Sequence, residues 1–378
     1  MKILYGVQGT GNGHISRARA MAAAFVKIPN VKVQYLFSGR PEANYFDMAA
    51  FGDYLVRRGL TFVSHEGKVD LLKTAQSNNV WQFLLDVRQL DVSAYDLVIS
   101  DFEPVSAHAA KRQGVPSLSI SHQSAFTYDV PIYGQGLFDK FVMRHFAPTE
   151  RKIGLHWYHF NQPILPPIID LPDVESSRSG PILTYLPFEK LEDVVATLQH
   201  FSHSFICFHP ECKSANRQGN VDVRPLSKHE FHEALMQCDG VIANGGFELP
   251  SEVLSLGKKL LLKPLSGQFE QQSNVATLDM LGLASAMNTL DIDVIRRWLT
   301  KTDSSKVVYP DVASALAKWL AEGDMETLPA LREHLWSQVI FPEHVTDLLS
   351  DFWPSQQRKR AMFSLQLSAI ANKKARQY

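Results

Sequence analysis

A glycine-rich turn directly after an apolar run at the start of the chain constrains the fold most. The sequence there is Ile3-Leu-Tyr-Gly-Val-Gln-Gly-Thr-Gly-Asn-Gly-His14, with three glycines in five residues. A buried strand that turns on glycines into a helix brings backbone N–H groups close to a ligand at the helix N-terminus. A second turn of this kind, Asn244-Gly-Gly-Phe-Glu248, follows another apolar run far along the chain. The two turns together predict two α/β halves with a binding site between them.

Segments typical of strands and of helices alternate through both halves of the chain. In the first half, we expect strands at residues 2–7, 31–37, 95–100 and 116–121, and helices at residues 14–27, 80–90 and 104–113. In the second half, we expect strands at residues 182–186, 204–208, 240–243 and 259–263, and helices at residues 188–200, 228–237, 250–256, 268–281, 291–300, 311–322 and 327–353. Such alternation indicates an α/β fold with parallel sheets covered by helices on both faces.

The length and the proline distribution indicate two domains. At roughly 150 residues per domain, the 378 residues of the chain correspond to about two domains. Prolines and small polar residues gather between residues 161 and 180 and mark a linker. We therefore expect domains at residues 1–162 and 163–340, and a basic tail at residues 354–378. In open α/β sheets ligands bind beyond the carboxyl ends of the strands, so the predicted site lies in a cleft between the domains.

The charge and the cysteine content limit the partners and the compartment. The formal net charge is −1, so nothing global indicates a nucleic-acid partner. Three cysteines, Cys207, Cys212 and Cys238, are too few for a disulfide framework and fit a reducing compartment. Glycines cut the N-terminal apolar run too short for a signal peptide, and no run of about 20 apolar residues indicates a membrane-spanning helix. We therefore expect a cytoplasmic protein.

The first candidate catalytic residue is His14, which follows the glycine-rich loop. That loop comprises Gly9, Thr10, Gly11, Asn12 and Gly13. The dipole at a helix N-terminus disfavours an imidazolium, so the ring would stay neutral and could accept a proton. A helix-start residue that only satisfies backbone groups explains the position as well. The glycine spacing departs from the dinucleotide fingerprint, and no acidic residue ends the second strand, which argues against NAD as a ligand.

Asp101 and His122 follow two other strands of the first half, at the same edge of the predicted sheet. A carboxylate at Asp101 could hold a nearby histidine in one tautomer and stabilise its protonated form. Asp101 could equally serve as the N-cap of the helix that begins near Pro104. We expect His122 to face the same cleft.

The turn after residues 241–243 is the candidate site for an anion. Free N–H groups and the helix dipole after Gly245 and Gly246 would face an anion such as a diphosphate. Glu252, in the first turn of the following helix, could reach ribose hydroxyls or could simply stabilise the helix dipole. The carboxylate and amide groups of residues 268–274 suit hydrogen bonds to a sugar or a nucleobase, although a polar helix face explains them equally well. His209, at the end of another strand, could line the donor side of the cleft.

Taken together, these motifs make the chain resemble the GT-B glycosyltransferases, and among them the family of MurG-like N-acetylglucosaminyltransferases, including a bacterial and archaeal subgroup. The resemblance covers most of residues 1–350 as architecture. The run Gly245-Gly-Phe-Glu-Leu-Pro-Ser-Glu252 and the later Glu270-Gln-Gln follow the donor-site pattern of the family at nearly matching spacing. The resemblance implies two Rossmann-like α/β/α domains that face a cleft, and a helix at residues 341–353 that crosses back onto the N-terminal domain.

The resemblance also implies roles for individual residues. His14 would be the base that deprotonates the acceptor hydroxyl, and Asp101 would orient this histidine. The donor-binding residues would be Gly245, Gly246, Phe247 and Ser251 at the diphosphate, Glu252 at the ribose, Gln271 and Gln272 near the sugar, and His209. The acceptor and phosphate side would comprise Gly9, Thr10, Gly11, Asn12, Gly13 and His122. No metal or other cofactor is expected, because the helix dipole and N–H groups would stabilise the leaving diphosphate.

The implied reaction is inverting transfer of a sugar from a UDP-sugar to an acceptor hydroxyl. The sugar could be N-acetylglucosamine or a related hexose, and the pathway cell-envelope, glycolipid or polysaccharide biosynthesis. The N-terminal loop departs from its form in MurG, so the acceptor does not carry over.

A lipid-linked acceptor and a peripheral membrane contact are one possibility. Residues 138–146 are amphipathic and cationic and could touch a membrane surface with help from the basic tail. A packed helix with a solvated basic edge explains that segment too. Two other functions stay open: a UDP-sugar 2-epimerase that uses cleft carboxylates such as Asp101 and Glu103, and a non-catalytic nucleotide-sugar-binding protein.

Overall fold

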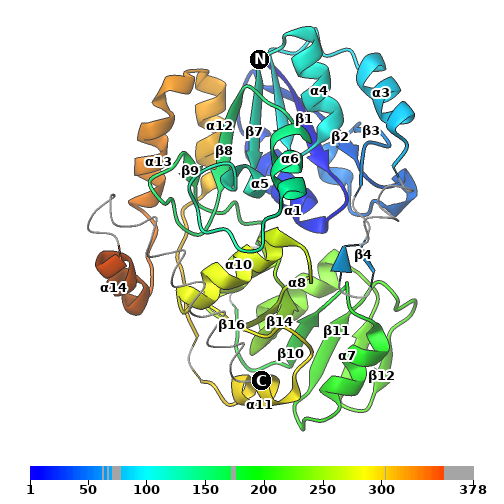
Figure 1. Ribbon diagram of the computed structural model, residues 1–378, viewed down its shortest axis with the longest axis vertical. Coiled ribbons are helices and arrows are strands. Elements are labelled where there is room, and N and C mark those ends of the chain that lie inside the picture. Colours follow the sequence, from blue (N-terminus) through cyan, green and yellow to red (C-terminus); the bar gives the residue numbers. More distant parts are fainter. Residues whose placement is uncertain (62–63, 66–67, 70–77, 172–175, 303, 353–378) are drawn as a thin grey trace.

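The structure, a computed structural model, describes residues 1–352 except residues 62–63, 66–67, 70–77, 172–175 and 303. The described part forms two α/β units, one above the other in Figure 1, and each is built on a seven-stranded sheet. The predicted basic tail at residues 354–378 lies outside the described residues.

The first sheet is parallel throughout, with the strand order β3-β2-β1-β6-β7-β8-β9. Ile3, Leu4, Tyr5 and Val7 of the inner strand β1 are buried, because elements of the fold cover both faces of the sheet. The strands are β1 (Lys2–Gln8), β2 (Lys32–Ser38), β3 (Leu55–Val56), β6 (Leu97–Asp101), β7 (Ser117–Ser121), β8 (Arg151–Leu155) and β9 (Ile164–Leu165). The helices are α1 (Asn12–Phe25), α3 (Val80–Gln89), α4 (Pro104–Gln113), α5 (His122–Ala125) and α6 (Leu137–His145), with short 3-10 turns at Glu42–Asn44 and Ala49–Phe51 and a hairpin of β4 (Ser64–His65) and β5 (Lys68–Val69).

The second sheet has the order β12-β13-β11-β10-β14-β15-β16, and every neighbouring pair except β12 and β13 is parallel. The strands are β10 (Ile182–Tyr185), β11 (Phe205–Phe208), β12 (Asn216–Gln218), β13 (Val221–Arg224), β14 (Gly240–Asn244), β15 (Lys259–Lys263) and β16 (Ser285–Ala286). The helices are α7 (Leu191–Leu198), α8 (Lys228–Gln237), α9 (Glu248–Leu256), α10 (Phe269–Met280) and α11 (Ile292–Leu299). The α/β fold class predicted from the alternation is confirmed.

The predicted linker at residues 161–180 is partly sheet. Ile164 and Leu165 form β9, which runs parallel to β8 at the edge of the first sheet. Both side chains and that of Ile168 are fully buried. The prolines beside them are tolerated because an edge strand leaves one row of N–H groups unpaired. Proline density therefore marked an edge strand here as well as a connection.

The chain returns to the first unit earlier than expected. Helix α12 (Val312–Glu322) packs against α1, and both α12 and α13 (Leu328–Trp336) lie beside the upper sheet in Figure 1. Nε1 of Trp336 donates a hydrogen bond of 2.8 Å to the Ile164 oxygen of β9. We predicted that residues 341–353 form the crossover helix. In the structure α12 and α13 already contact the first unit, and His344 of α14 (Glu343–Phe352) lies beside Gly282 of the second unit.

The predicted helix at residues 327–353 is also two helices. The chain leaves the helical path after α13, where Ile340 pairs with Val308 in a β-bridge and Pro342 precedes α14. Proline cannot continue a helix from the residues before it. An apolar helix face shows that a helix is buried, but it does not show which domain buries it. The sequence therefore did not locate the crossing.

Both sheets direct the carboxyl ends of their strands at one cleft. In the first sheet Val7 of β1 lies opposite Asp101 of β6, so the loop after β1 and Asp101 share one edge. In the second sheet β14 pairs with β10, which brings the turn at residues 244–248 to the corresponding edge. The units touch directly, since Nε1 of Trp157 donates to Oγ of Ser251 at 2.9 Å. Two Rossmann-like domains that face a cleft are confirmed as the architecture.

Candidate active site

A cavity of about 300 Å³ lies between the two units. The first unit contributes the loop after β1, the start of α1 and residues of α5. The second unit contributes the loop after β10, the start of α8, the turn after β14 and the start of α10. The predicted site residues on its wall are Gly11, Asn12, Gly13, His14, His122, Gly246, Phe247, Glu252 and Gln271.

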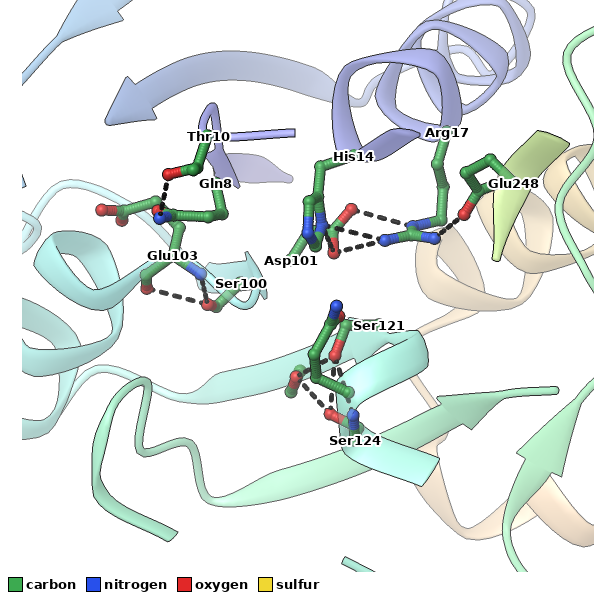
Figure 2. A network of polar contacts seen from close by, with 12 residues as sticks. Gln8, Thr10, His14, Arg17, Ser100, Asp101, Glu103, Ser121, Ser124 and Glu248 are labelled. Atoms are coloured by element: carbon green, nitrogen blue, oxygen red, sulfur yellow. Dashed lines mark hydrogen bonds and ion pairs between the residues drawn. The ribbon is translucent and has the colours of Figure 1, made fainter. Parts of the chain in front are cut away.

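His14 and Asp101 form a hydrogen-bonded pair at this wall (Figure 2). The Nδ1 atom of His14 lies 2.8 Å from Oδ1 of Asp101. The Asp101 side chain is fully buried, whereas the His14 side chain is 13% exposed. When Nδ1 carries the proton toward Asp101, Nε2 carries the lone pair that can accept a proton. The alternative that Asp101 caps α4 is wrong, because the carboxylate of Glu103 accepts hydrogen bonds from the N–H groups of Val105 and Ser106.

Arg17 and Glu248 complete a buried network that the sequence analysis missed (Figure 2). Nε and Nη2 of Arg17 donate to the two carboxylate oxygens of Asp101 at 2.8 and 2.7 Å. Nη1 of Arg17 donates to Glu248 of α9, in the other unit. The three-residue spacing from His14 to Arg17 on one helix was a usable signal for Arg17. No sequence signal was available for Glu248, because 231 residues separate it from Arg17.

Burial and neighbouring charges shift the pKa values of the carboxyl groups in this network in opposite directions. Burial would raise the pKa of Asp101, but Arg17 and His14 favour the carboxylate and hold the pKa below its ordinary value. Burial raises the pKa of Glu248 to about 8, although the Arg17 guanidinium opposes that rise. Asp101 is therefore the ionised partner of His14 at neutral pH.

The turn after β14 and the start of α9 border the cavity. Helix α9 begins at Glu248 without a side-chain cap, so N–H groups of its first turn have no intrahelical acceptor. A Cβ atom on Gly246 would meet nothing within 4 Å among the described residues. A Cβ atom on Gly245 would lie only 2.9 Å from the Gln271 oxygen and 2.6 Å from Val275. Gly246 therefore borders open space, whereas Gly245 permits close packing on α10.

Glu252 lies one turn further along α9 and is 5% exposed. Burial, followed by the negative charge of Glu248, raises the pKa of Glu252 well above its ordinary value. On α10, Oε1 of Gln271 accepts a hydrogen bond of 2.9 Å from the N–H of Leu265, which fixes the orientation of this amide at the cavity wall. Both side chains can offer hydrogen bonds to hydroxyl groups of a ligand.

His122 is part of the contact between the two units. Its ring stacks on Phe247 with the centroids 4.0 Å apart and the planes at 5°. Nδ1 lies 2.8 Å from the Leu155 oxygen, and Nε2 lies 2.7 Å from Oδ1 of Asn274 on α10. The ring faces the cleft as predicted, but both of its nitrogens already face protein oxygens.

Some predicted site residues do not line the cavity. These are Gly9, Thr10, Asp101, Gly245, Ser251, Gln272 and His209. Ser251 is fully buried and forms a hydrogen bond with Trp157. The Gln272 side chain lies against Gly134, because successive residues of a helix point about 100° apart and Gln271 points to the cavity. Nε2 of the buried His209 bonds to the Glu189 oxygen at 3.0 Å, away from the cavity.

The start of the first loop also packs on protein. The N–H of Gly9 donates to the Ser38 oxygen at 2.6 Å, and a Cβ atom on Gly9 would collide with Tyr45. Thr10 accepts a hydrogen bond of 2.9 Å from Nε2 of Gln8. The contact of this loop with the cavity therefore begins only at Gly11.

Two further properties of the described residues concern metal ions and membranes. These residues contain no group of three or more His, Cys, Asp or Glu side chains placed to hold a metal ion. None of their helices combines the length and the apolar character that crossing a membrane requires.

The chain is similar to known glycosyltransferases. The family model of glycosyl transferase family 1 matches residues 1–302. Phytolacca americana UGT2, solved in complex with UDP-2-fluoro-glucose and pterostilbene, is 12% identical over 93% of this chain and 98% of its own, with a TM-score of 0.55. The glycosyltransferase SsfS6 of Streptomyces sp. SF2575 is 12% identical over 85% and 95%, with a TM-score of 0.51. MurG of Acinetobacter baumannii is 14% identical over 92% and 98%, with a TM-score of 0.47.

These similarities extend over both units of the fold. They confirm the GT-B glycosyltransferase fold that the glycine-rich turns predicted. No curated protein matches the chain in sequence.

Proposed function

Since this chain belongs to glycosyl transferase family 1 and is a glycosyltransferase, we propose that it transfers a sugar from a UDP-sugar to an acceptor hydroxyl with inversion. The sugar would be N-acetylglucosamine or a related hexose. The observation that carries the proposal is the His14–Asp101 pair at the wall of the cavity between the two units. The cavity is open to the groups of both units, as a reaction between a donor and an acceptor requires.

In the proposed reaction, Nε2 of His14 removes the proton of the acceptor hydroxyl. The acceptor oxygen attacks the anomeric carbon, and the bond from that carbon to the diphosphate oxygen breaks. The electron pair of that bond leaves with UDP, and attack from the opposite side inverts the anomeric configuration. The buried, ionised Asp101 stabilises the imidazolium that forms on His14.

The second unit would hold the donor. The uncapped start of α9 and the open space at Gly246 support binding of the diphosphate there. Arg19 and Lys228 on the cavity wall add positive charge, so the proposed leaving step would need no metal. The carboxyl group of Glu252 suits the ribose, and Gln271 suits the sugar. A uridine donor is further supported by UGT2, which has this fold and was solved with a UDP-sugar analogue.

We also propose that α6 contacts an anionic membrane surface, where a lipid-linked acceptor would be met during envelope or glycolipid synthesis. Leu137, Phe138 and Phe141 are 86%, 57% and 62% exposed. Lys140 and Arg144 on the same helix are exposed as well and complement anionic headgroups. Replacing Phe138 and Phe141 by serine should lower co-sedimentation with phosphatidylglycerol vesicles, and unchanged binding would contradict the contact.

Ligand stabilisation followed by product analysis tests the function. UDP at about 100 times its Kd should raise the stability by roughly 2.7 kcal/mol, whereas TDP, GDP, ADP and NAD should have smaller effects. Mass spectrometry of reactions with UDP-sugars and candidate acceptors should then show a glycosylated acceptor. An epimer formed without acceptor would indicate a UDP-sugar 2-epimerase instead, and UDP binding without any turnover would indicate a sensor. No response to UDP would contradict the donor site.

A further inference from the structure

The first glycine-rich loop needs support from outside to keep its shape. Three of the five residues from Gly9 to Gly13 are glycines, which lose more conformational freedom on folding than other residues. Helix α1 then begins after Gly11, and no side chain of that residue caps the first N–H groups of the helix. His14, the proposed base, lies in the first turn of this helix. The position of the base therefore depends on the contacts that fix the loop.

Arg40, which comes two residues after β2, holds this loop at two points. Its Nε donates a hydrogen bond to the backbone oxygen of Gly9. Its Nη2 donates to Oδ1 of Asn12 at 3.0 Å. The guanidinium is planar and carries its donors in a fixed fork. One rigid group therefore connects the start of the loop to the first residue of α1.

The surroundings of Arg40 hold its side chain beside the loop. The guanidinium carbon lies 5.2 Å from the centroid of the Tyr45 ring, and Nη1 donates to the Asn44 oxygen at 3.4 Å. Gly39 turns the chain toward the loop with a φ of 99°, which residues with a side chain rarely adopt. A Cβ atom on Gly39 would also lie 2.7 Å from Oγ1 of Thr10. The turn that brings Arg40 to the loop thus requires a glycine.

The support from Arg40 extends further along the loop than the hydrogen bonds of Gly9 and Thr10 described above. Those bonds hold residues that precede α1. Arg40 holds Asn12, with which α1 begins, and His14 follows two residues later in the same turn. A displacement of Asn12 would therefore move the imidazole ring as well.

We infer that Arg40 is a positioning residue for His14. This inference rests on the proposed function and adds a residue on which the base depends. Arg40 is not among the described residues that line the cavity, so it acts on the reaction through the loop. The contact of His14 with Asp101 is 2.8 Å long, and such a bond weakens steeply when its geometry is distorted. Loss of Arg40 would therefore leave the base in place in the sequence but out of place in the site.

NMR of the full chain labelled at histidine tests the positioning in the free protein. The His14→Gln variant assigns the His14 ring signal. Arg40→Met removes the hydrogen bonds at a similar side-chain length, and we expect the His14 signal to shift and broaden. Arg40→Lys should act in the same way, because one ammonium group does not reproduce the fork. The His122 signal should stay unchanged, since that ring is held by contacts of α5 and α10.

Arg57→Met is the matched control. Arg57 follows the neighbouring strand β3 and donates to the Val56 oxygen at 2.8 Å, so it too is an arginine bonded to the backbone of this sheet. Its replacement should leave the His14 signal unchanged. A His14 signal at the wild-type position in folded Arg40→Met protein overturns the inference. If Arg40→Met does not fold, Arg40→Lys gives the same decision.

A double-mutant cycle of sugar transfer tests the consequence for catalysis. Arg40→Met should lower kcat by about tenfold or more, as a small misplacement of a catalytic group does. In the His14→Ala background the same change should cost less than about twofold, because a base that is absent cannot be misplaced. Equal losses in both backgrounds would indicate a general structural defect and would overturn the inference. Absence of transfer by the wild type would instead refute the proposed function, and the NMR comparison would still decide whether Arg40 positions His14.

Discussion

The two glycine-rich turns look alike in sequence and differ in what their glycines do. In the first turn, Gly9 packs on Tyr45 and Gly13 admits Glu248, so the glycines make room for the protein itself. In the second turn, Gly246 borders the cavity, and a Cβ atom there would meet nothing within 4 Å among the described residues. The first turn therefore places His14 and its network, whereas the second leaves open space at the cavity wall. Two glycine-rich turns at the ends of strands can therefore differ in what their glycines do.

The largest expected effect comes from the residue that the first turn places. His14→Ala should lower sugar transfer by about 10²–10⁴-fold, the usual contribution of a general base, and leave UDP affinity unchanged. Steady-state transfer and calorimetric titration of UDP measure the two properties. The matched control is His200→Ala, an exposed histidine of the second unit. Transfer that persists in His14→Ala would refute the assignment of the base and, with it, the task given to the first turn.

The second turn contains a glycine that serves packing, and its replacement should cost stability. A methyl group at Gly245 would meet the backbone of α10 at 2.9 Å. Gly245→Ala should therefore lower the free energy of unfolding by about 1–3 kcal/mol, as overpacking of a filled interior does. Chemical denaturation measures the loss. A variant as stable as the wild type would show that α10 yields and that both glycines of this turn can be replaced.

The neighbouring glycine should show the opposite behaviour. Gly246→Ala adds a methyl group in open space, so the thermal midpoint of the free protein should stay within about 2 °C of the wild type, the range of ordinary surface changes. The same methyl group would stand where the diphosphate is proposed to lie, and UDP affinity should fall about tenfold, or 1.4 kcal/mol. Calorimetry on both glycine variants makes the comparison. Equal UDP affinity in Gly246→Ala and the wild type would contradict a diphosphate at this turn.

The smallest effect concerns the pH dependence of stability through Glu252. Burial keeps this carboxyl group protonated in the folded protein above its ordinary pKa, whereas the unfolded chain releases the proton. The folded state then binds more protons, so the free energy of unfolding falls as the pH rises between the two pKa values. Glu252→Gln removes this loss, and the variant should gain stability over the wild type as the pH rises from mildly acidic to mildly alkaline. Scanning calorimetry measures the difference in stability between Glu252→Gln and the wild type at each pH. A difference that shrinks as the pH rises would contradict the burial of this group.

Much of the first domain could be predicted from the sequence, because apolar runs mark the buried strands and the residues after each run mark the carboxyl edge of the sheet. The apolar runs before Gly9 and Asp101 predicted two strands of one parallel sheet, and parallel strands bring their carboxyl ends to one edge. The 2.8 Å contact between His14 and Asp101 follows from that arrangement. The direction of individual side chains was harder to predict. The family motif assigned both Gln271 and Gln272 to the sugar, but only Gln271 lines the cavity.

The contacts between the units could not be predicted, for a physical reason. Arg17 and Glu248, like Trp157 and Ser251, meet only because two separately built domains close on each other. The hydrophobic periodicity of a single segment does not predict contacts between residues of different domains. The same limit explains the crossover, where the amphipathic helices were recognised but the domain that buries them was not.

The stereochemistry of transfer tests the central claim most directly. Proton NMR of the anomeric signal, recorded while an α-linked UDP-sugar reacts with an accepted hydroxyl, distinguishes the two possible products. One displacement with His14 as the base predicts a β-linked product at the earliest times, and its loss in His14→Ala. An α-linked product would contradict the direct displacement for which we propose that the cavity, the His14–Asp101 pair and the turn at Gly246 are arranged.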